Sequence, residues 1–191
     1  SGHLRRTAAL ARALDGQVPD VTVASGGLPL SHLECGAARF VQLPPVRAAD
    51  AGFTALVDGE GGAVDERLWA RRAALLAALL AEQKPAVIVT ETFPFGRRQL
   101  RHEATALLDG AAGLERPPLV VASVRDILQR QSDPARIAAM LDLARLRYDA
   151  ILVHGDPRLV ALEESFPAAS LLGERVIHTG YIATGRAAAR T

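Results

Sequence analysis

Short, continuously apolar segments alternate along this chain with longer segments of helical periodicity, and this alternation restricts the possible folds more than any other feature. Helices are predicted at 1–16, from Asp65 up to Pro85, and after Asp133-Pro134. Strands are predicted at 20–25, 38–44, 86–91, 119–124, 150–155 and 175–180. This order predicts an α/β fold with a doubly wound, mostly parallel sheet.

Two further segments have weaker patterns. Residues 47–64 are rich in glycine and aspartate and are predicted to form a loop. Asp156-Pro157 repeats the cap-and-proline pattern of Asp133-Pro134 and predicts another helix start there.

Composition and missing motifs exclude several classes of protein. With 191 residues and a net charge of +1, the chain has room for about one α/β domain and no general attraction to nucleic acid. Its single cysteine, Cys35, excludes an internal disulfide and a four-cysteine zinc site, and no apolar run is long enough to span a membrane. The phosphate-loop, complete dinucleotide-binding, zinc-protease and nucleophile-elbow motifs are all missing.

Polar residues follow the predicted strands directly, where ligands bind in doubly wound sheets. In "TETFPFGRRQLRHE" (90–103), two arginines are suited to an anion, and the phenylalanines are either an apolar platform or part of the core. Two later strands are followed by "SVRDIL" and "VHGDP". In the first segment, Arg125 and Asp126 are alternatively a surface ion pair. In the second, Asp156 is alternatively a helix N-cap. The candidate residues are Glu91, Phe95, Gly96, Arg97, Arg98, Ser123, Arg125, Asp126, His154 and Gly155.

The chain opens with Gly2-His3 at the start of its first predicted helix. The N–H groups of a helix N-terminus favour an anion, and a histidine there is suited to act as a general base. The alternative is a capping histidine at a frayed terminus.

Taken together, several segments resemble the N-terminal half of predicted bacterial glycosyltransferases of the GT-B fold, distant relatives of the undecaprenyl-linked N-acetylglucosaminyltransferase of peptidoglycan synthesis. The resemblance covers essentially the whole chain. It rests on "SGHLRRTAALARAL", "TFPFGRRQLRHE", "SVRDIL", "YDAILVHGDP" and "VIHTGYI".

The resemblance implies a Rossmann-like, acceptor-side domain at 1–182 and a tail or the start of an interdomain linker at 183–191. The donor-side domain is expected to be absent from this chain. The family's opening motif is a strand followed by Gly-x-Gly-His, of which Ser1-Gly2-His3 are present here. The first strand, usually central in such a sheet, is therefore expected to be missing, which leaves a gap or requires another segment to replace it.

The functional expectations follow from this resemblance. His3 is expected to be catalytic, and Gly2 joins the candidate residues above in binding substrate. The expected partners are a nucleotide-sugar donor, a hydroxyl acceptor and the protein's own C-terminal domain, and a peripheral membrane contact is left open. The expected location is the cytoplasm. No metal, other cofactor or nucleic acid is expected. The chain alone is expected to be inactive. Two alternatives remain, a UDP-sugar 2-epimerase of the same fold using Glu91 and Asp126, and a non-catalytic module that binds sugar nucleotides or anions.

Overall fold

The computed structural model of this protein describes residues 2–50 and 55–182, so Ser1 and the predicted tail at 183–191 lie outside the described residues. The helices are α1 (Gly2–Leu14), α2 (Glu66–Gln83), α3 (Arg101–Ala112) and α4 (Pro134–Arg147). The strands are β1 (Thr22–Ser25), β2 (Arg39–Gln42), β3 (Val46–Ala48), β4 (Leu56–Asp58), β5 (Val87–Glu91), β6 (Leu119–Arg125), β7 (Ala150–His154) and β8 (Val176–His178). Short 3₁₀ segments lie at Arg98–Leu100, Leu162–Glu164 and Pro167–Arg175.

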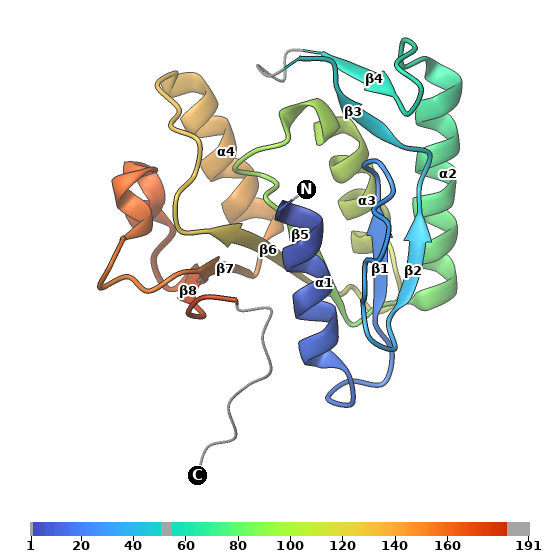
Figure 1. The fold of residues 1–191 in the computed structure, drawn as a ribbon. Coiled ribbons are helices and arrows are strands. Elements are labelled where there is room, and N and C mark those ends of the chain that lie inside the picture. The colour runs from blue at the N-terminus through green and yellow to red at the C-terminus, as the bar shows by residue number, and fades with distance from the viewer. Residues whose placement is uncertain (1, 51–54, 183–191) are drawn as a thin grey trace.

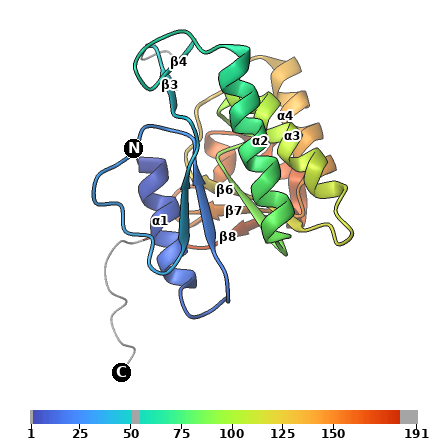
Figure 2. The same cartoon turned by 90° about the vertical axis from the view of Figure 1, so that its right-hand side faces the viewer.

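A parallel four-stranded sheet in the order β5-β6-β7-β8 forms the larger part of the molecule. One of its faces carries the buried side chains of β6 and β7, which pack with Leu108 of α3 and with Leu141 and Ala144 of α4. Figure 2 shows α2, α3 and α4 on one side of the molecule and α1 on the other. The α/β class and the parallel arrangement of these strands are therefore confirmed.

A second, smaller unit is formed by α1, β1 and β2. The two strands pair in parallel with each other, and among the described strands neither pairs with β5. Ala8 and Ala11 of α1 pack on Val23 of β1, and α1 lies in front of the space between β1 and β5 (Figure 1). Within the described residues, β1–β2 and β5–β8 thus form two separate parallel sheets.

Capping residues set the helix boundaries as predicted in two places. The Asp65 side chain accepts a hydrogen bond from Leu68 N at the start of α2, and Asp133 caps α4 ahead of Pro134. At the end of α2, Lys84 takes the left-handed conformation and donates its N–H to Leu80 O. Pro85 then prevents further helix.

Two local predictions were wrong. The segment predicted as a loop at 47–64 contains the antiparallel pair β3 and β4 in its described part, and the pairing of Val46 with Asp58 starts just before it. After β7, the chain makes a single turn and no helix starts at Asp156. The Asp156 carboxylate instead accepts hydrogen bonds from Arg158, which lower its pKa to about 2.

Arg72 of α2 connects the small unit to the rest of the fold, and it is fully buried. Its Nε and Nη2 atoms donate to the two oxygens of Glu103 of α3, at 2.6 and 2.8 Å. Its Nη1 donates to Gly26 O, 3.0 Å away, and to Pro44 O, which follow β1 and β2. A Cβ at Gly26 would lie 2.3 Å from the Arg72 Nη2 atom, so this close approach requires glycine.

Candidate functional site

His3 and Glu91 meet at the carboxyl edge of the β5–β8 sheet. His3 lies in the first turn of α1, and Glu91 is the last residue of β5. The His3 Nδ1 atom is 3.0 Å from Glu91 Oε1, and the His3 side chain is 38% exposed. The described residues provide no hydrogen-bond partner for His3 Nε2, which therefore remains open to a ligand.

Glu91 accepts hydrogen bonds on both of its carboxylate oxygens. Burial opposes its ionisation, but hydrogen bonds from His3 and Arg6 and the charge of Arg6 outweigh burial and lower the pKa of Glu91. The Thr92 hydroxyl donates to Oε1 at 3.0 Å, and the Ser123 hydroxyl donates to Oε2 at 3.1 Å. An ionised carboxylate only accepts hydrogen bonds, so His3 Nδ1 must carry the proton.

A line of hydrogen bonds continues from Glu91 across the strand ends. Ser123 Oγ lies 2.8 Å from His154 Nε2, and His154 Nδ1 lies 2.7 Å from Thr179 Oγ1. Because the Ser123 hydroxyl gives its single proton to Glu91, it accepts from His154 Nε2–H. Burial and the charge of Arg6 lower the pKa of His154, although Glu91 raises it, so the ring is neutral near pH 7 and its Nδ1 accepts from Thr179.

Every donor in this line is therefore directed toward Glu91, from the residue after β8, from β7 and from β6 on one side, and from α1 on the other. The network brings together three of the candidate residues at strand ends: Glu91, Ser123 and His154. The network also contains residues that the sequence analysis did not single out: Arg6, Thr92 and Thr179. Both threonines directly follow a strand, so the rule that identified Ser123 and His154 would have found them.

The loop after β5 positions Arg97 and places Phe95 in the core. Phe95 is 4% exposed and contacts Phe166 edge-on, with ring centroids 5.5 Å apart. The hypothesis of an exposed aromatic platform is therefore wrong for Phe95, because burying its ring completes the core. A Cβ at Gly96 would lie 2.7 Å from Thr92 Cγ2, so Gly96 allows the loop to turn back on itself.

The two predicted arginines of this loop lie in different surroundings. Arg97 has a left-handed backbone (φ 55°) and is exposed as a residue, but its guanidinium lies near Glu91 and Arg6. Partial desolvation lowers the pKa of Arg97, Glu91 raises it, and Arg6 lowers it. Arg98 is exposed in the following 3₁₀ segment and makes no hydrogen bond or ion pair with this cluster among the described residues.

Arg125 and Asp126 lie beyond the end of the hydrogen-bonded line. Arg125 Nε donates to Ile127 O, and Asp126 Oδ1 accepts from Ile127 N, so the two side chains satisfy backbone groups. Tyr181 adds a hydrogen bond to Asp126. A Cβ at Gly155 would lie 2.5 Å from Asp126 Cβ, so Gly155 allows these strand ends to approach each other.

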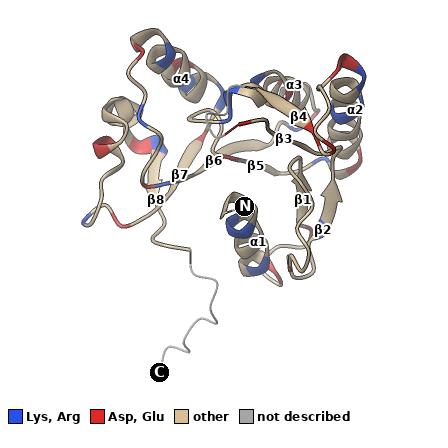
Figure 3. Cartoon of the chain, turned by 45° about the horizontal axis from the view of Figure 1, so that its top comes forward, with Lys and Arg blue, Asp and Glu red and all other residues tan. Residues whose placement is uncertain are grey.

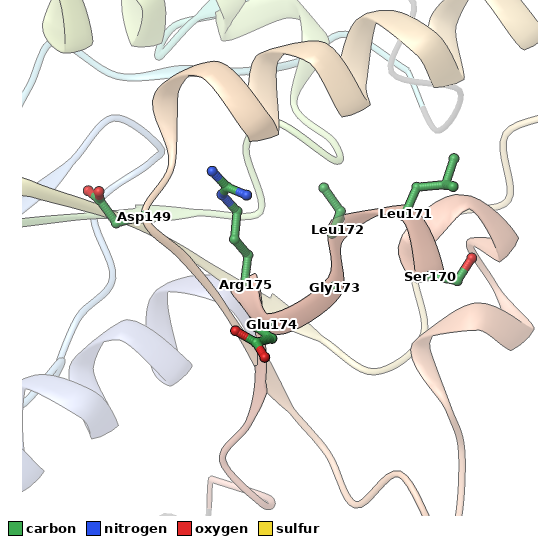
Figure 4. A pocket seen from close by; sticks show the side chains of 7 residues that line it. All are labelled: Asp149, Ser170, Leu171, Leu172, Gly173, Glu174 and Arg175. Atoms are coloured by element: carbon green, nitrogen blue, oxygen red, sulfur yellow. The ribbon is translucent and has the colours of Figure 1, made fainter.

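An open hollow lies at the opposite, amino edge of the sheet, where β7 and β8 begin. Figure 4 shows its lining side chains, with Glu174 and Arg175 diverging from each other. The Arg175 Nε atom donates to Tyr148 O. The lining residues are Asp149 and 170–175, none of which belongs to the His3–Glu91 network.

Comparison with known proteins identified no relative of this chain. No family model, no curated protein and no solved structure matches it. Within residues 2–50 and 55–182, no helix combines the length and apolar character needed to cross a membrane.

Proposed function

We propose that this chain is the acceptor-binding half of a glycosyltransferase, in which His3 accepts the proton of the attacking hydroxyl. One observation carries the proposal. Glu91 fixes the Nδ1–H of His3 at the carboxyl edge of a parallel sheet, which leaves Nε2 open at the place where such folds bind ligands. A carboxylate in this position both orients the imidazole and stabilises the imidazolium that forms.

The surroundings of this pair favour an anionic ligand beside the reacting hydroxyl. Arg6 and Arg97 both lie near Glu91, so this small region has two guanidinium charges against one carboxylate. In Figure 3 the ribbon of α1 is coloured blue for arginine near its N-terminal end. Guanidinium groups bind phosphate well, which is consistent with a phosphate-bearing acceptor or the diphosphate of a nucleotide sugar.

In the proposed reaction the acceptor hydroxyl hydrogen-bonds to His3 Nε2 and attacks the anomeric carbon of the donor sugar. The new bond joins the acceptor oxygen to that carbon, and the bond to the nucleoside diphosphate breaks, so the diphosphate departs with the electron pair. His3 takes the hydroxyl proton, and Glu91 stabilises the resulting positive charge. The donor is expected to be held mainly by a second domain.

The epimerase alternative receives less support from this geometry. Glu91 already accepts hydrogen bonds from four side chains, and its lowered pKa makes it a weak base. Asp126 is bonded to Ile127 N and to Tyr181. Glu91 is therefore less suited to remove a proton from a sugar carbon than His3, whose Nε2 is open.

The test is a transfer assay on the polypeptide that carries both halves, with a panel of nucleotide sugars and hydroxyl acceptors and release of nucleoside diphosphate as the readout. His3→Ala should lower turnover about 10²–10⁴-fold, the usual contribution of a positioned base. His102→Ala is the matched control, since this exposed histidine lies on α3 outside the network.

Other outcomes identify the alternatives. Conversion of a UDP-sugar into its 2-epimer without transfer would show the epimerase. Binding of nucleotide sugars with no turnover would show the non-catalytic module. Full transfer activity in His3→Ala would remove His3 from the mechanism.

A further inference from the structure

Three residues form a strand-end line of hydrogen bonds that leads to Glu91: Ser123, His154 and Thr179. Thr179 directly follows β8, and its N–H donates to Val153 O of β7 at 3.0 Å. This bond places its hydroxyl 2.7 Å from His154 Nδ1. The same hydroxyl lies 3.2 Å from Gly180 O, which only accepts. Thr179 therefore has two arrangements: it donates to His154, or it donates to Gly180 and accepts from His154.

His154 also bonds in either direction, because its neutral ring has two tautomers. With the proton on Nε2, the ring donates to Ser123 and accepts from Thr179. With the proton on Nδ1, it donates to Thr179 and accepts from Ser123. Both tautomers satisfy both ring nitrogens, so the ring itself does not determine the direction of the strand-end line.

Ser123 connects the ring to the carboxylate. Its hydroxyl has one proton, which goes either to Glu91 Oε2, 3.1 Å away, or to His154 Nε2, 2.8 Å away. Ser123 is 1% exposed, so this hydroxyl is shielded from solvent. An ionised carboxylate only accepts, and a hydrogen bond to a charged acceptor is stronger than one to a neutral acceptor. The charge of Glu91 therefore draws the proton of Ser123 and aligns the other two residues behind it.

The two oxygens of Glu91 receive different donors. Oε1 lies beside His3 Nδ1, the Thr92 hydroxyl and Arg6 Nη2. Oε2 lies beside the Ser123 hydroxyl at 3.1 Å and Arg6 Nε at 3.4 Å, so Ser123 is its closer donor. The bond from Ser123 opposes rotation of the carboxylate and thereby keeps Oε1 directed at His3.

We propose that the strand-end line positions Glu91 for its contact with His3, and that the charge of Glu91 in turn sets the direction of every hydrogen bond in the line. Its three members act through Glu91 and need no contact with substrate. The effect on His3 as a base rests on the proposed function, whereas the direction of the line does not.

Glu91→Gln should reverse the strand-end line. The three donors at Oε1 keep the amide oxygen in that position, so the amide nitrogen takes the position of Oε2 and donates to Ser123 Oγ. The Ser123 hydroxyl then gives its proton to His154 Nε2. His154 must carry its own proton on Nδ1 and donate it to Thr179, which turns to Gly180 O.

The test is the nitrogen-15 NMR spectrum of the imidazole side chains at pH 8. The pKa of His154 is lowered from 6.5, so its neutral ring predominates there. Wild type should show the Nε2–H tautomer of His154 and Glu91→Gln the Nδ1–H tautomer, each in about tenfold excess, as expected for one hydrogen bond. His102, exposed on α3, is the internal control and should give the same spectrum in both proteins.

Substitutions at Thr179 show whether the reversed direction uses its hydroxyl. Combined with Glu91→Gln, Thr179→Val removes the acceptor of the Nδ1 proton and should abolish the excess of the Nδ1–H tautomer, whereas Thr179→Ser should retain it. Thr105→Val on α3 is the matched control. Ser123→Ala provides a second route to the reversed tautomer, because it leaves the Nε2 proton of His154 without an acceptor.

Turnover tests the effect on His3. In the polypeptide that carries both halves, Ser123→Ala should lower kcat about tenfold and leave KM nearly unchanged, because Ser123 acts on Glu91. A direct contact between Ser123 and substrate would raise KM instead. Ser170→Ala is the matched control, since Ser170 lies at the opposite edge of the sheet.

Three results would overturn the proposal: the Nδ1–H tautomer of His154 in wild type, the same tautomer in wild type and Glu91→Gln, or an unchanged kcat in Ser123→Ala. The spectra require no substrate, so they distinguish this proposal from the proposed function. An unchanged His154 tautomer together with full transfer activity would overturn the strand-end line alone. A reversed tautomer together with no transfer of any sugar would support the direction of the line and overturn the glycosyltransferase.

Discussion

The four-stranded sheet and the small α1–β1–β2 unit are held together in different ways. The cluster of buried residues under β5–β8 has fifteen members and includes the rings of Phe93, Phe95 and Phe166. The cluster under α1 has four members and contains no residue larger than Val23. Since apolar burial stabilises by about 25 cal/mol per Å², the small unit contributes little of its own.

The small unit depends instead on polar connections to the larger one. Arg72 joins the ends of β1 and β2 to α3, and Glu91 joins α1 to β5, β6 and β7 through Arg6, His3 and Ser123. The proposed site therefore lies at the boundary between the well-packed β5–β8 sheet and the α1–β1–β2 unit, which is attached mainly through hydrogen bonds and ion pairs. Substitutions that remove a polar connection should therefore lower the local stability of the α1–β1–β2 unit much more than that of the β5–β8 sheet.

The largest effect is expected at Arg72. Arg72→Met leaves Glu103 without its buried partner and two backbone carbonyls without donors, so the free energy of unfolding should fall by about 3–5 kcal/mol. Urea unfolding measures this, with Arg71→Met on the exposed side of α2 as the control. Hydrogen exchange should accelerate in β1 and β2 far more than in β6 and β7. Equal acceleration in both sheets would contradict the two-part description.

A smaller effect is expected at Glu91. Glu91→Gln weakens the charge-assisted hydrogen bonds from His3 and Arg6, and stability at pH 7 should fall by about 1.5–3 kcal/mol. Glu115→Gln, at an exposed position, is the control.

The pH dependence provides a second check on Glu91. The folded-state pKa of Glu91 is lowered from 4.5, so its ionised form stabilises the fold above pH 4.5, and this contribution is lost as pH falls from there through the lowered pKa. The difference between wild type and Glu91→Gln should therefore shrink over this range in thermal unfolding. A constant difference from pH 7 to pH 3 would show that Glu91 acts through packing alone.

His154 should have a weaker effect, limited to mildly acidic pH. Its pKa is lowered from 6.5 by burial, so the unfolded chain binds the proton more readily than the folded chain. Stability should therefore decline as pH falls from about 6.5 toward the lowered pKa, and His154→Gln should lose this part of the decline. NMR titration should give His154 a midpoint below 6.5. A midpoint at or above 6.5 would place His154 outside the buried network.

The smallest effect is expected at Arg98. Arg98→Ala should change stability by less than about 0.5 kcal/mol, because the side chain is exposed. It should also leave pyrophosphate binding nearly unchanged, whereas Arg97→Ala should weaken that binding about tenfold or more. Calorimetric titration of both variants checks this. Equal losses in the two variants would restore the original hypothesis that the arginines act as a pair.

The residues of the large sheet show why much of the fold could be predicted from sequence. β6 and β7 are short apolar runs with buried residues, as expected of parallel strands, whereas Val87 and Val89 of the equally apolar β5 are about half exposed. Asp65 and Asp133 mark the starts of α2 and α4 by local chemistry. Glu91, Ser123 and His154 could be placed together because parallel strands share one carboxyl edge.

The rest could not be predicted because it depends on contacts between distant segments. Arg72 is on a helix that also carries exposed arginines, and its partners Gly26, Pro44 and Glu103 come from three other segments. Nothing in the local pattern distinguishes it from its neighbour Arg71. The surroundings of Phe95 could not be predicted for the same reason, since a phenylalanine after a strand is equally suited to a ligand platform and to the core.

The measurement that tests the central claim most directly is the nitrogen-15 NMR spectrum of the imidazole side chains at pH 7 and above. The neutral His3 ring should be the Nδ1–H tautomer, because Nδ1 donates to Glu91, with Nε2 free to accept a proton. In Glu91→Gln this tautomer preference should weaken, while His102 should be unchanged. A His3 that carries its proton on Nε2, or whose spectrum is the same in wild type and Glu91→Gln, would contradict the assignment of His3 as the base of this site.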